Sequence, residues 1–284
     1  RFMTLQDRLK FLKVIIHSDT APNGITGLCG GFELKNWRYD QFATWLFDNH
    51  LLDFALTHSD LDKINHQNAI ERIRSAAKTI FQSNNLNRGE FGELLLHAII
   101  KESYNTIPAI SKIYFKDGPN ETVKGFDAVH VVAEKNDLEL WLGEVKFYND
   151  FKGAVRDVVK ELEGHFKEDY LKREFAAITN KVDKGFPHYD KLVKLLNPNT
   201  SLDDVFKTIC VPVLLTYDSA LVSKHREFNQ AYIDEIIVEV EENHKHFRSK
   251  VNCPVKIHLF LMPLEDKAKL AQTLLDKLAA WQRI

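Results

Sequence analysis

An apolar segment of the chain ends in two residues of opposite charge, Glu144 and Lys146. Leu138, Leu140 and Leu142 precede them at alternate positions, and alternate residues of a β-strand point to the same side of a sheet. A charge removed from water costs several kcal/mol unless it is compensated, so these side chains need each other, a metal ion or water. For this segment alone, the simplest interpretation is an ion pair at an exposed strand end, worth under about 1 kcal/mol.

A third charge, Asp127, lies in the strand-like segment KGFDAVHVV. Asp is disfavoured in strands, and taken alone it is best interpreted as a turn residue at the strand's start. The spacing from Asp127 to Glu144 accommodates one strand, a turn at residues 134–137 and an antiparallel return strand. Such a hairpin would bring two carboxylates side by side, where they repel unless a cation lies between them. Oxygen ligands favour Mg²⁺ or Mn²⁺ over zinc.

The segment EFGELLLHAIIK, residues 90–101, predicts a buried helix because apolar residues occupy almost its whole circumference. Its polar residues form one narrow stripe of Glu90, Glu93, His97 and Lys101. We expect Glu90 and Lys101, near the helix ends, to reach solvent, and His97 to be a hydrogen-bonded core residue. For Glu93, solvent exposure and a carboxylate that faces a polar cavity are equally compatible with the pattern.

The remaining pattern predicts the elements that position these residues. Residues 1–81 form a mostly helical N-terminal part, with a loop over residues 18–31, a helix capped by Asn36 and a second helix over residues 70–80. The polar segment 82–89 marks a boundary. Strands are expected over residues 110–115, 126–133, 138–147, 209–217 and 255–262, and helices over 90–103, from Asn149 or Asp150, near 168–180, about 227–248 and from 265 onward. The alternation predicts an α/β fold, a mixed central sheet flanked by helices on both faces.

The composition excludes several classes of protein. With 284 residues, 44% hydrophobic and 27% charged, the chain has the balance of a globular protein and not of a disordered or fibrous one. Thirty-eight Lys and Arg against forty Asp and Glu mean that any nucleic-acid contact needs a local basic surface on this chain or on a partner. Three widely spaced cysteines argue against a zinc knuckle and a secreted disulfide framework, so we expect a cytoplasmic protein. No apolar run reaches the roughly 20 residues of a membrane span.

In combination, these motifs resemble the PD-(D/E)XK nuclease superfamily, over about residues 88–168. The matching positions are Gly89 and Glu93 for its first-helix signature, Asp127 for its metal-binding aspartate, and Glu144, Val145 and Lys146 for its E-x-K motif. Phe126 stands where the superfamily name has proline. The resemblance implies a restriction-endonuclease-like fold and a Mg²⁺-dependent deoxyribonuclease, with Mn²⁺ as a possible substitute.

The resemblance also implies a role for each residue. Asp127, Glu144 and the backbone carbonyl of Val145 would hold the metal, with Glu93 joining through a water molecule. Lys146 would orient or help to deprotonate the attacking water and would offset charge on the phosphate.

A basic stripe on the following helix is a candidate for contact with the DNA backbone. Its residues, spaced by four, are Lys152, Arg156 and Lys160. Asp157 and Glu161 are interleaved with them, which favours the alternative that the stripe is a solvated helix face.

Longer segments narrow the resemblance to the HamA family, the nuclease subunit of the Hachiman anti-phage defence system. RGEFGELLLH, KGFDAVHVV and LWLGEVKFYND resemble its C-terminal catalytic domain, and NWRYDQFATWL and DFALTHSDL its N-terminal part. The resemblance implies a nuclease restrained by a partner superfamily 2 helicase, HamB-like, and the chain contains no G-x-x-x-x-G-K-[ST] phosphate loop of its own. Residues 1–81 would be a regulatory or partner-docking region and residues 82–284 the PD-(D/E)XK nuclease domain.

Two alternatives stay open at this point. The same motif occurs in restriction-like and Holliday-junction-resolving nucleases, and a junction resolvase would be a symmetric homodimer. The fold also tolerates loss of chemistry, which would leave a catalytically inactive DNA-binding or interaction subunit.

Overall fold

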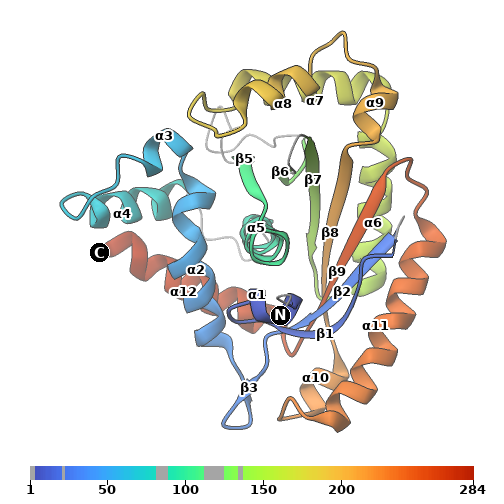
Figure 1. Cartoon of the computed structure of the whole chain (residues 1–284). Helices are drawn as coiled ribbons and strands as arrows, with labels where there is room; N and C mark the ends of the chain where they lie inside the picture. Colours follow the sequence, from blue (N-terminus) through green and yellow to red (C-terminus); the bar gives the residue numbers. More distant parts are fainter. Residues whose placement is uncertain (1–3, 21–22, 81–88, 112–124, 134–136) are drawn as a thin grey trace.

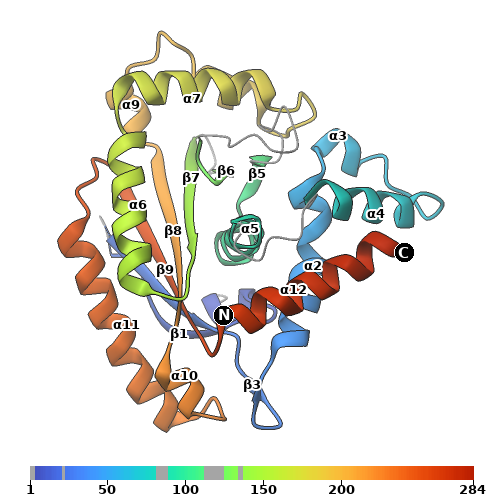
Figure 2. The same ribbon diagram turned by 180° about the vertical axis from the view of Figure 1, so that it is seen from behind.

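A seven-stranded mixed sheet forms the centre of the protein (Figures 1 and 2). The computed structural model describes residues 4–20, 23–80, 89–111, 125–133 and 137–284. In spatial order the strands are β1 (Lys13–Ser18), β2 (Asn23–Cys29), β9 (Lys256–Leu264), β8 (Ile209–Asp218), β7 (Leu138–Phe147), β6 (Ala128–Ala133) and β5 (Ile107–Ser111). Neighbours from β2 to β7 pair in parallel, and β1, β6 and β5 pair antiparallel.

Helices cover both faces of this sheet, which confirms the predicted α/β class (Figures 1 and 2). One face carries α5 (Glu90–Tyr104), and behind α5 lie α2 (Tyr39–Ala55), α4 (Ala69–Ile80) and α12 (Lys267–Arg283). The other face carries α6 (Phe151–His165) and α11 (Gln230–Lys250). The shorter elements are α1 (Leu5–Arg8), β3 (Phe32–Glu33), β4 (Asn36–Trp37), α3 (His58–Leu61), α7 (Glu168–Lys181), α8 (Tyr189–Leu195), α9 (Leu202–Phe206) and α10 (Ala220–Lys224).

The predicted elements with strong periodicity are confirmed closely. Strand β7 has the predicted bounds, and α4 and α5 match their predicted helices to within one residue. Helix α6 starts after Asp150, whose carboxylate accepts a hydrogen bond from the N–H of Gly153 at 2.7 Å and so caps the first turn. None of the helices in the described part of the chain is long and apolar enough to cross a membrane.

The loop predicted over residues 18–31 is wrong, because half of this segment is strand β2. This strand lies between β1 and β9, and its glycines are sites of close packing and not of turns. A Cβ on Gly24 would lie 2.4 Å from the His258 ring, and one on Gly27 would lie 3.0 Å from Val240. The N-cap predicted at Asn36 is also wrong: Asn36 belongs to β4, and α2 begins after Arg38.

Strands β1 and β2 belong to the same sheet as β7, β8 and β9. The N-terminal part of the chain is therefore joined to the central sheet by backbone hydrogen bonds and is not wholly helical. The predicted boundary near residues 81–82 falls outside the described residues, as do residues 112–115 and 134–136 of the predicted strand and turn. The division of the chain into two regions stays a prediction.

Helix α5 approaches β7 closely at Gly92. A Cβ at this position would lie 2.9 Å from Cγ2 of Val145 and 3.0 Å from the Cβ of Phe147. Gly143 on β7 is similarly tight against Leu96 of α5. The odd-numbered residues at the end of β7 thus face α5, which directs Glu144 and Lys146 to the opposite face.

We predict that Gly92→Ala destabilises the protein by about 1–3 kcal/mol, because the added methyl group forces the helix away from β7. Gly164→Ala is the matched control, since Gly164 lies in α6 and a Cβ there meets no atom within 4 Å. Alanine favours a helix over glycine, so this control should be neutral or stabilising by up to about 1 kcal/mol. Urea unfolding measures both, and equal stability of the two variants would contradict the close approach.

Candidate active site between β7 and α6

The β6–β7 hairpin brings Asp127 beside Glu144. Ala128 pairs with Gly143, so the residue before Ala128 lies across from the residue after Gly143. The Asp127 N–H donates to the Gly143 carbonyl at 2.8 Å, and the Asp127 Oδ2 accepts from the Val145 N–H at 2.8 Å. Both carboxylates are buried, with 6% of Asp127 and 1% of Glu144 exposed. Two acidic residues thus meet inside the sheet, where ionised carboxylates need compensation.

Two side chains of α6 contact the charged residues at the end of β7. His165 Nδ1 lies 2.7 Å from Glu144 Oε1, and the Lys146 ammonium donates to Glu161 Oε2. The Lys146 and His165 side chains are only 10% and 12% exposed, whereas that of Glu161 is 44% exposed. Glu161 therefore lies at the mouth of the site and the other three side chains lie inside it.

A third contact continues the series, because the Tyr148 hydroxyl donates to Asp157 Oδ2 at 3.2 Å. From one contact to the next, the residue on the strand side advances by two positions, and its partner on α6 lies four positions earlier. Two strand residues span about 6.6 Å and four helical residues about 6.0 Å, so the two spacings nearly match. We call the helix side of this arrangement, Asp157, Glu161 and His165, the α6 ladder.

Lys146 carries a positive charge at neutral pH. Burial by itself lowers the pKa of its ammonium, but Asp127, Glu161 and Glu144 outweigh burial and raise the pKa above its ordinary value. In this environment the side chain acts as a fixed cation and hydrogen-bond donor.

Aromatic rings hold His165 in place. The Phe126 ring meets it edge-on with centroids 4.8 Å apart, and the Tyr170 ring stacks on it at 4.6 Å. Farther along α7, Glu174 is 6% exposed, and its Oε1 would lie 2.8 Å from a Cβ on Gly125. The segment that carries Asp127 is thus enclosed by α6 and α7.

Sequence reasoning missed Glu161, His165 and Glu174. The recurrence of polar residues at 157, 161 and 165 was the available signal, and it looks the same for a solvated helix face as for one that pairs with a charged strand. Asp157 and Glu161, which are interleaved with the basic stripe in the sequence, belong to the α6 ladder.

The two acidic residues of the polar stripe predicted on α5 are both buried. Glu90 is 6% exposed and Glu93 is 5% exposed, so the solvent position expected for Glu90 is wrong. Glu93 follows Gly92 on α5. Because Gly92 packs on Val145, this helix lies on the face of β7 opposite α6. A water-mediated role for Glu93 at a metal stays a prediction.

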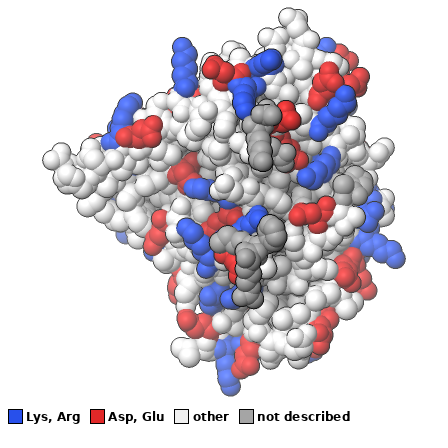
Figure 3. Space-filling view, in the orientation of Figure 1, with Lys and Arg blue, Asp and Glu red and all other residues white. Residues whose placement is uncertain are grey.

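The basic stripe of α6, Lys152, Arg156 and Lys160, is exposed. Arg156 Nε contacts Asp157 Oδ1 at 2.9 Å. On the face in Figure 3, basic and acidic side chains are interspersed instead of forming one large basic patch. A contact of this stripe with DNA stays a prediction.

The donor set fits a hard divalent cation. Asp127 and Glu144 offer carboxylate oxygens from adjacent strands, and the E-x-K segment also offers the Val145 carbonyl. A cation between the two carboxylates would relieve their mutual repulsion. These residues are therefore the ones that would hold Mg²⁺ or Mn²⁺.

A family model for HamA matches residues 7–278 of the chain. The chain belongs to the HamA family. It is therefore a subunit of the Hachiman anti-phage defence system, as the sequence motifs predict. The matched residues include all seven strands of the sheet described above, with the hairpin and α6. A search of curated proteins found no match.

In this HamA protein, we predict that Glu161→Gln lowers the pKa of Lys146, because Glu161 is one of the charges that raise it. The pKa of Lys146 in the folded protein lies above the ordinary value of 10.5. The charged ammonium therefore stabilises the folded protein at neutral pH, and this contribution is lost as the pH rises through the folded-state pKa. NMR of ¹³C-labelled lysine in metal-free protein measures the titration, with Lys146→Met to assign the signal. Glu163→Gln, an exposed neighbour on α6, is the control, and an equal effect of both substitutions would contradict the pairing.

Proposed function

We propose that this HamA protein is a metal-dependent deoxyribonuclease of the PD-(D/E)XK type. The observation that carries the proposal is the meeting of Asp127, Glu144 and Lys146 in one buried site at the end of β7. Two carboxylates and one ammonium inside a sheet are costly, so a fold that keeps them there needs a reason beyond stability.

In the proposed mechanism, Asp127 and Glu144 would hold Mg²⁺, which would supply an activated water and neutralise charge on the scissile phosphate. Lys146, held cationic by its carboxylate neighbours, orients that water and offsets the charge that grows on the phosphate. His165 fixes the orientation of Glu144 through the Nδ1 contact, and the Val145 N–H fixes that of Asp127.

We further propose that a superfamily 2 helicase subunit controls this activity. Membership of a defence system supports a partner, and the chain has no phosphate-loop motif to bind ATP itself. A nuclease that encounters the cell's own DNA needs restraint until the partner signals a target. The regulatory or docking role proposed for residues 1–81 would operate through a segment whose strands β1 and β2 belong to the sheet that holds the site.

We predict that Asp127→Asn and Glu144→Gln lower the Mg²⁺-dependent cleavage rate at least about a hundredfold, equivalent to about 2.7 kcal/mol in the barrier. Both should also weaken Mn²⁺ binding, because each removes a ligand charge. Lys146→Met should lower the cleavage rate by a similar factor. It should leave the Mn²⁺ affinity unchanged or raise it, because it removes a positive charge that repels the ion. Cleavage of linear and circular DNA, with and without the helicase, and calorimetric Mn²⁺ titration provide the measurements.

The matched control is Glu139→Gln, which lies on the same strand outside the site and contacts Lys256. Circular dichroism verifies that each variant is folded. Full cleavage by the Glu144→Gln, Lys146→Met double variant would refute the site. No cleavage by the wild-type complex on any DNA would favour the inactive interaction subunit, and cleavage confined to four-way junctions would favour a resolvase.

We also predict that the α6 stripe contacts DNA. Replacing Lys152, Arg156 and Lys160 together by Gln should weaken DNA binding and reduce the slope of log affinity against log salt by about 0.9 for each phosphate that is no longer neutralised. DNA binding is measured in the absence of Mg²⁺ and Mn²⁺, so that the DNA is not cleaved. The control replaces three exposed basic residues of α11, Lys245, Arg248 and Lys250, and so changes net charge equally. Equal salt slopes for the two variants would show that the stripe is a solvated face.

A further inference from the structure

A buried histidine and carboxylate cluster lies between α2 and α5, outside the site described above. One ring nitrogen each of His50 and His97 and one oxygen of Asp53 lie within 4.8 Å of one another. His50 and His97 are 2% and 1% exposed, and their ring centroids are 6.2 Å apart. His50 and Asp53 occupy one face of α2 at a spacing of three residues, and His97 projects from α5.

Each histidine is oriented through its other ring nitrogen. His50 Nε2 lies 3.0 Å from Glu102 Oε1, and this oxygen is fixed by the Trp45 indole N–H at 3.0 Å. His97 Nδ1 lies 3.1 Å from His130 Nε2. A carboxylate behind one imidazole nitrogen leaves the lone pair on the other, which is the arrangement that supports histidines at metal centres.

The nitrogens left over are both buried. His97 Nε2 lies 3.3 Å from Asp53 Oδ2, whereas His50 Nδ1 has no hydrogen-bond partner among the described residues. Buried polar atoms are normally satisfied, so the unpaired His50 Nδ1 needs an explanation. Two imidazoles and one carboxylate match the ligand preference of zinc and related ions and not that of Mg²⁺.

We propose that His50, Asp53 and His97 bind a divalent transition-metal ion of the zinc class, separate from the Asp127 and Glu144 site. The ion would take three protein ligands and one water. Lys101 is the competing cation, because its ammonium donates to Asp53 Oδ2. The Lys101 side chain is 37% exposed and Asp53 is 14% exposed, so the ammonium can move into solvent when an ion replaces it.

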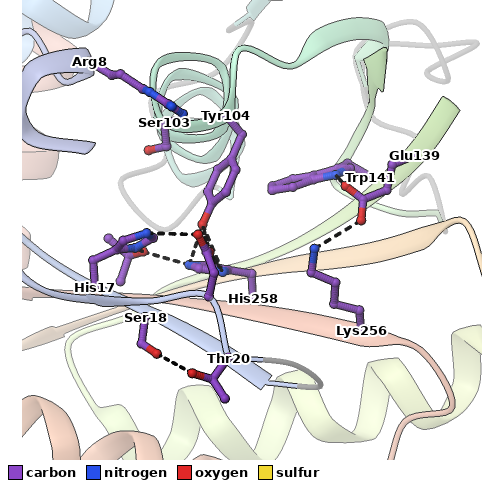
Figure 4. Close-up of polar contacts among 12 residues, drawn as sticks. Arg8, His17, Ser18, Thr20, Ser103, Tyr104, Glu139, Trp141, Lys256 and His258 are labelled. Atoms are coloured by element: carbon purple, nitrogen blue, oxygen red, sulfur yellow. Dashed lines mark hydrogen bonds and ion pairs between the residues drawn. The ribbon is translucent and has the colours of Figure 1, made fainter. Parts of the chain in front are cut away.

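A second cluster of two histidines and an aspartate has satisfied nitrogens and serves as the internal comparison (Figure 4). His17 Nδ1 and His258 Nε2 both lie 2.8 Å from the Thr26 hydroxyl, and the Tyr104 hydroxyl donates to Asp19 at 2.5 Å. The hydrogen bonds of this network satisfy its buried polar atoms without an ion.

An ion at the proposed site would tie two helices together at a sensitive place. His97 lies one turn after Glu93 on α5, the helix that packs on β7 through Gly92. Asp53 and His50 belong to α2, from the N-terminal part of the chain. The ion would therefore fix the position of α5 relative to α2.

The test uses the full chain, stripped of metal and titrated with Co²⁺ and then Zn²⁺ in excess Mg²⁺. We expect one Zn²⁺ per chain, visible Co²⁺ absorption bands typical of nitrogen ligation, and a Tm increase of about 5 °C or more at 100-fold excess over Kd. His50→Gln and Asp53→Asn should weaken binding by about 100-fold or more. Lys101→Met should tighten it about tenfold, because no cation has to leave Asp53.

Two controls locate the ion. His258→Gln removes a nitrogen from the comparison cluster, and Glu144→Gln alters the candidate active site; neither should change Zn²⁺ affinity. Loss of binding in either control, or no saturable Zn²⁺ binding by the wild-type chain, would overturn the proposal. If Asp53→Asn does not fold, Lys101→Met still decides, because unchanged or weaker binding contradicts competition at Asp53. None of these readouts depends on DNA cleavage.

Discussion

The structure depends on the compensation of charge inside an apolar sheet. Strand β7 has sheet neighbours on both sides and helices on both faces, yet it presents Glu144 and Lys146 toward α6 with Asp127 beside them. The near match between two strand residues and four helical residues lets one helix meet successive side chains of one strand. The α6 ladder uses this match, with His165 against Glu144 and Glu161 against Lys146. The path of α6 across the sheet follows from that pairing as well as from its apolar face.

The opposite face of β7 sets a second constraint, since α5 packs closely against it. Gly92 makes this approach possible, and Gly143 does the same from the strand. Helix α2 packs on α5, and strands β1 and β2 extend the sheet beyond β9. The N-terminal part of the chain therefore contacts α5 and belongs to the same sheet as β7. A partner bound to the N-terminal part could influence α5 and β7 through these contacts.

The sequence predicts those parts of the fold in which periodicity and burial agree. Strand β7, α4 and α5 have strong patterns, and the hairpin spacing predicts Asp127 beside Glu144. Strand β2 escapes prediction because Gly24 and Gly27, which allow close packing, look like turn residues. Glu161 and His165 escape because a polar helix face has the same pattern whether it meets water or a charged strand. Glu90 is misjudged because its burial depends on tertiary packing at a helix end.

The two ladder contacts at Glu144 and Lys146 differ in exposure, and this difference has a consequence for the proposed chemistry. Glu144 and His165 are enclosed, whereas Glu161 is nearly half exposed and holds Lys146 from the solvent side. A phosphate group that approaches from solvent brings negative charge to the same ammonium and can replace Glu161 without leaving Lys146 unpaired. A cation between Asp127 and Glu144 would strengthen this exchange, because it takes over part of the neutralisation that Lys146 now provides. The ladder can therefore keep the site stable before substrate arrives while Lys146 stays charged and positioned for phosphate.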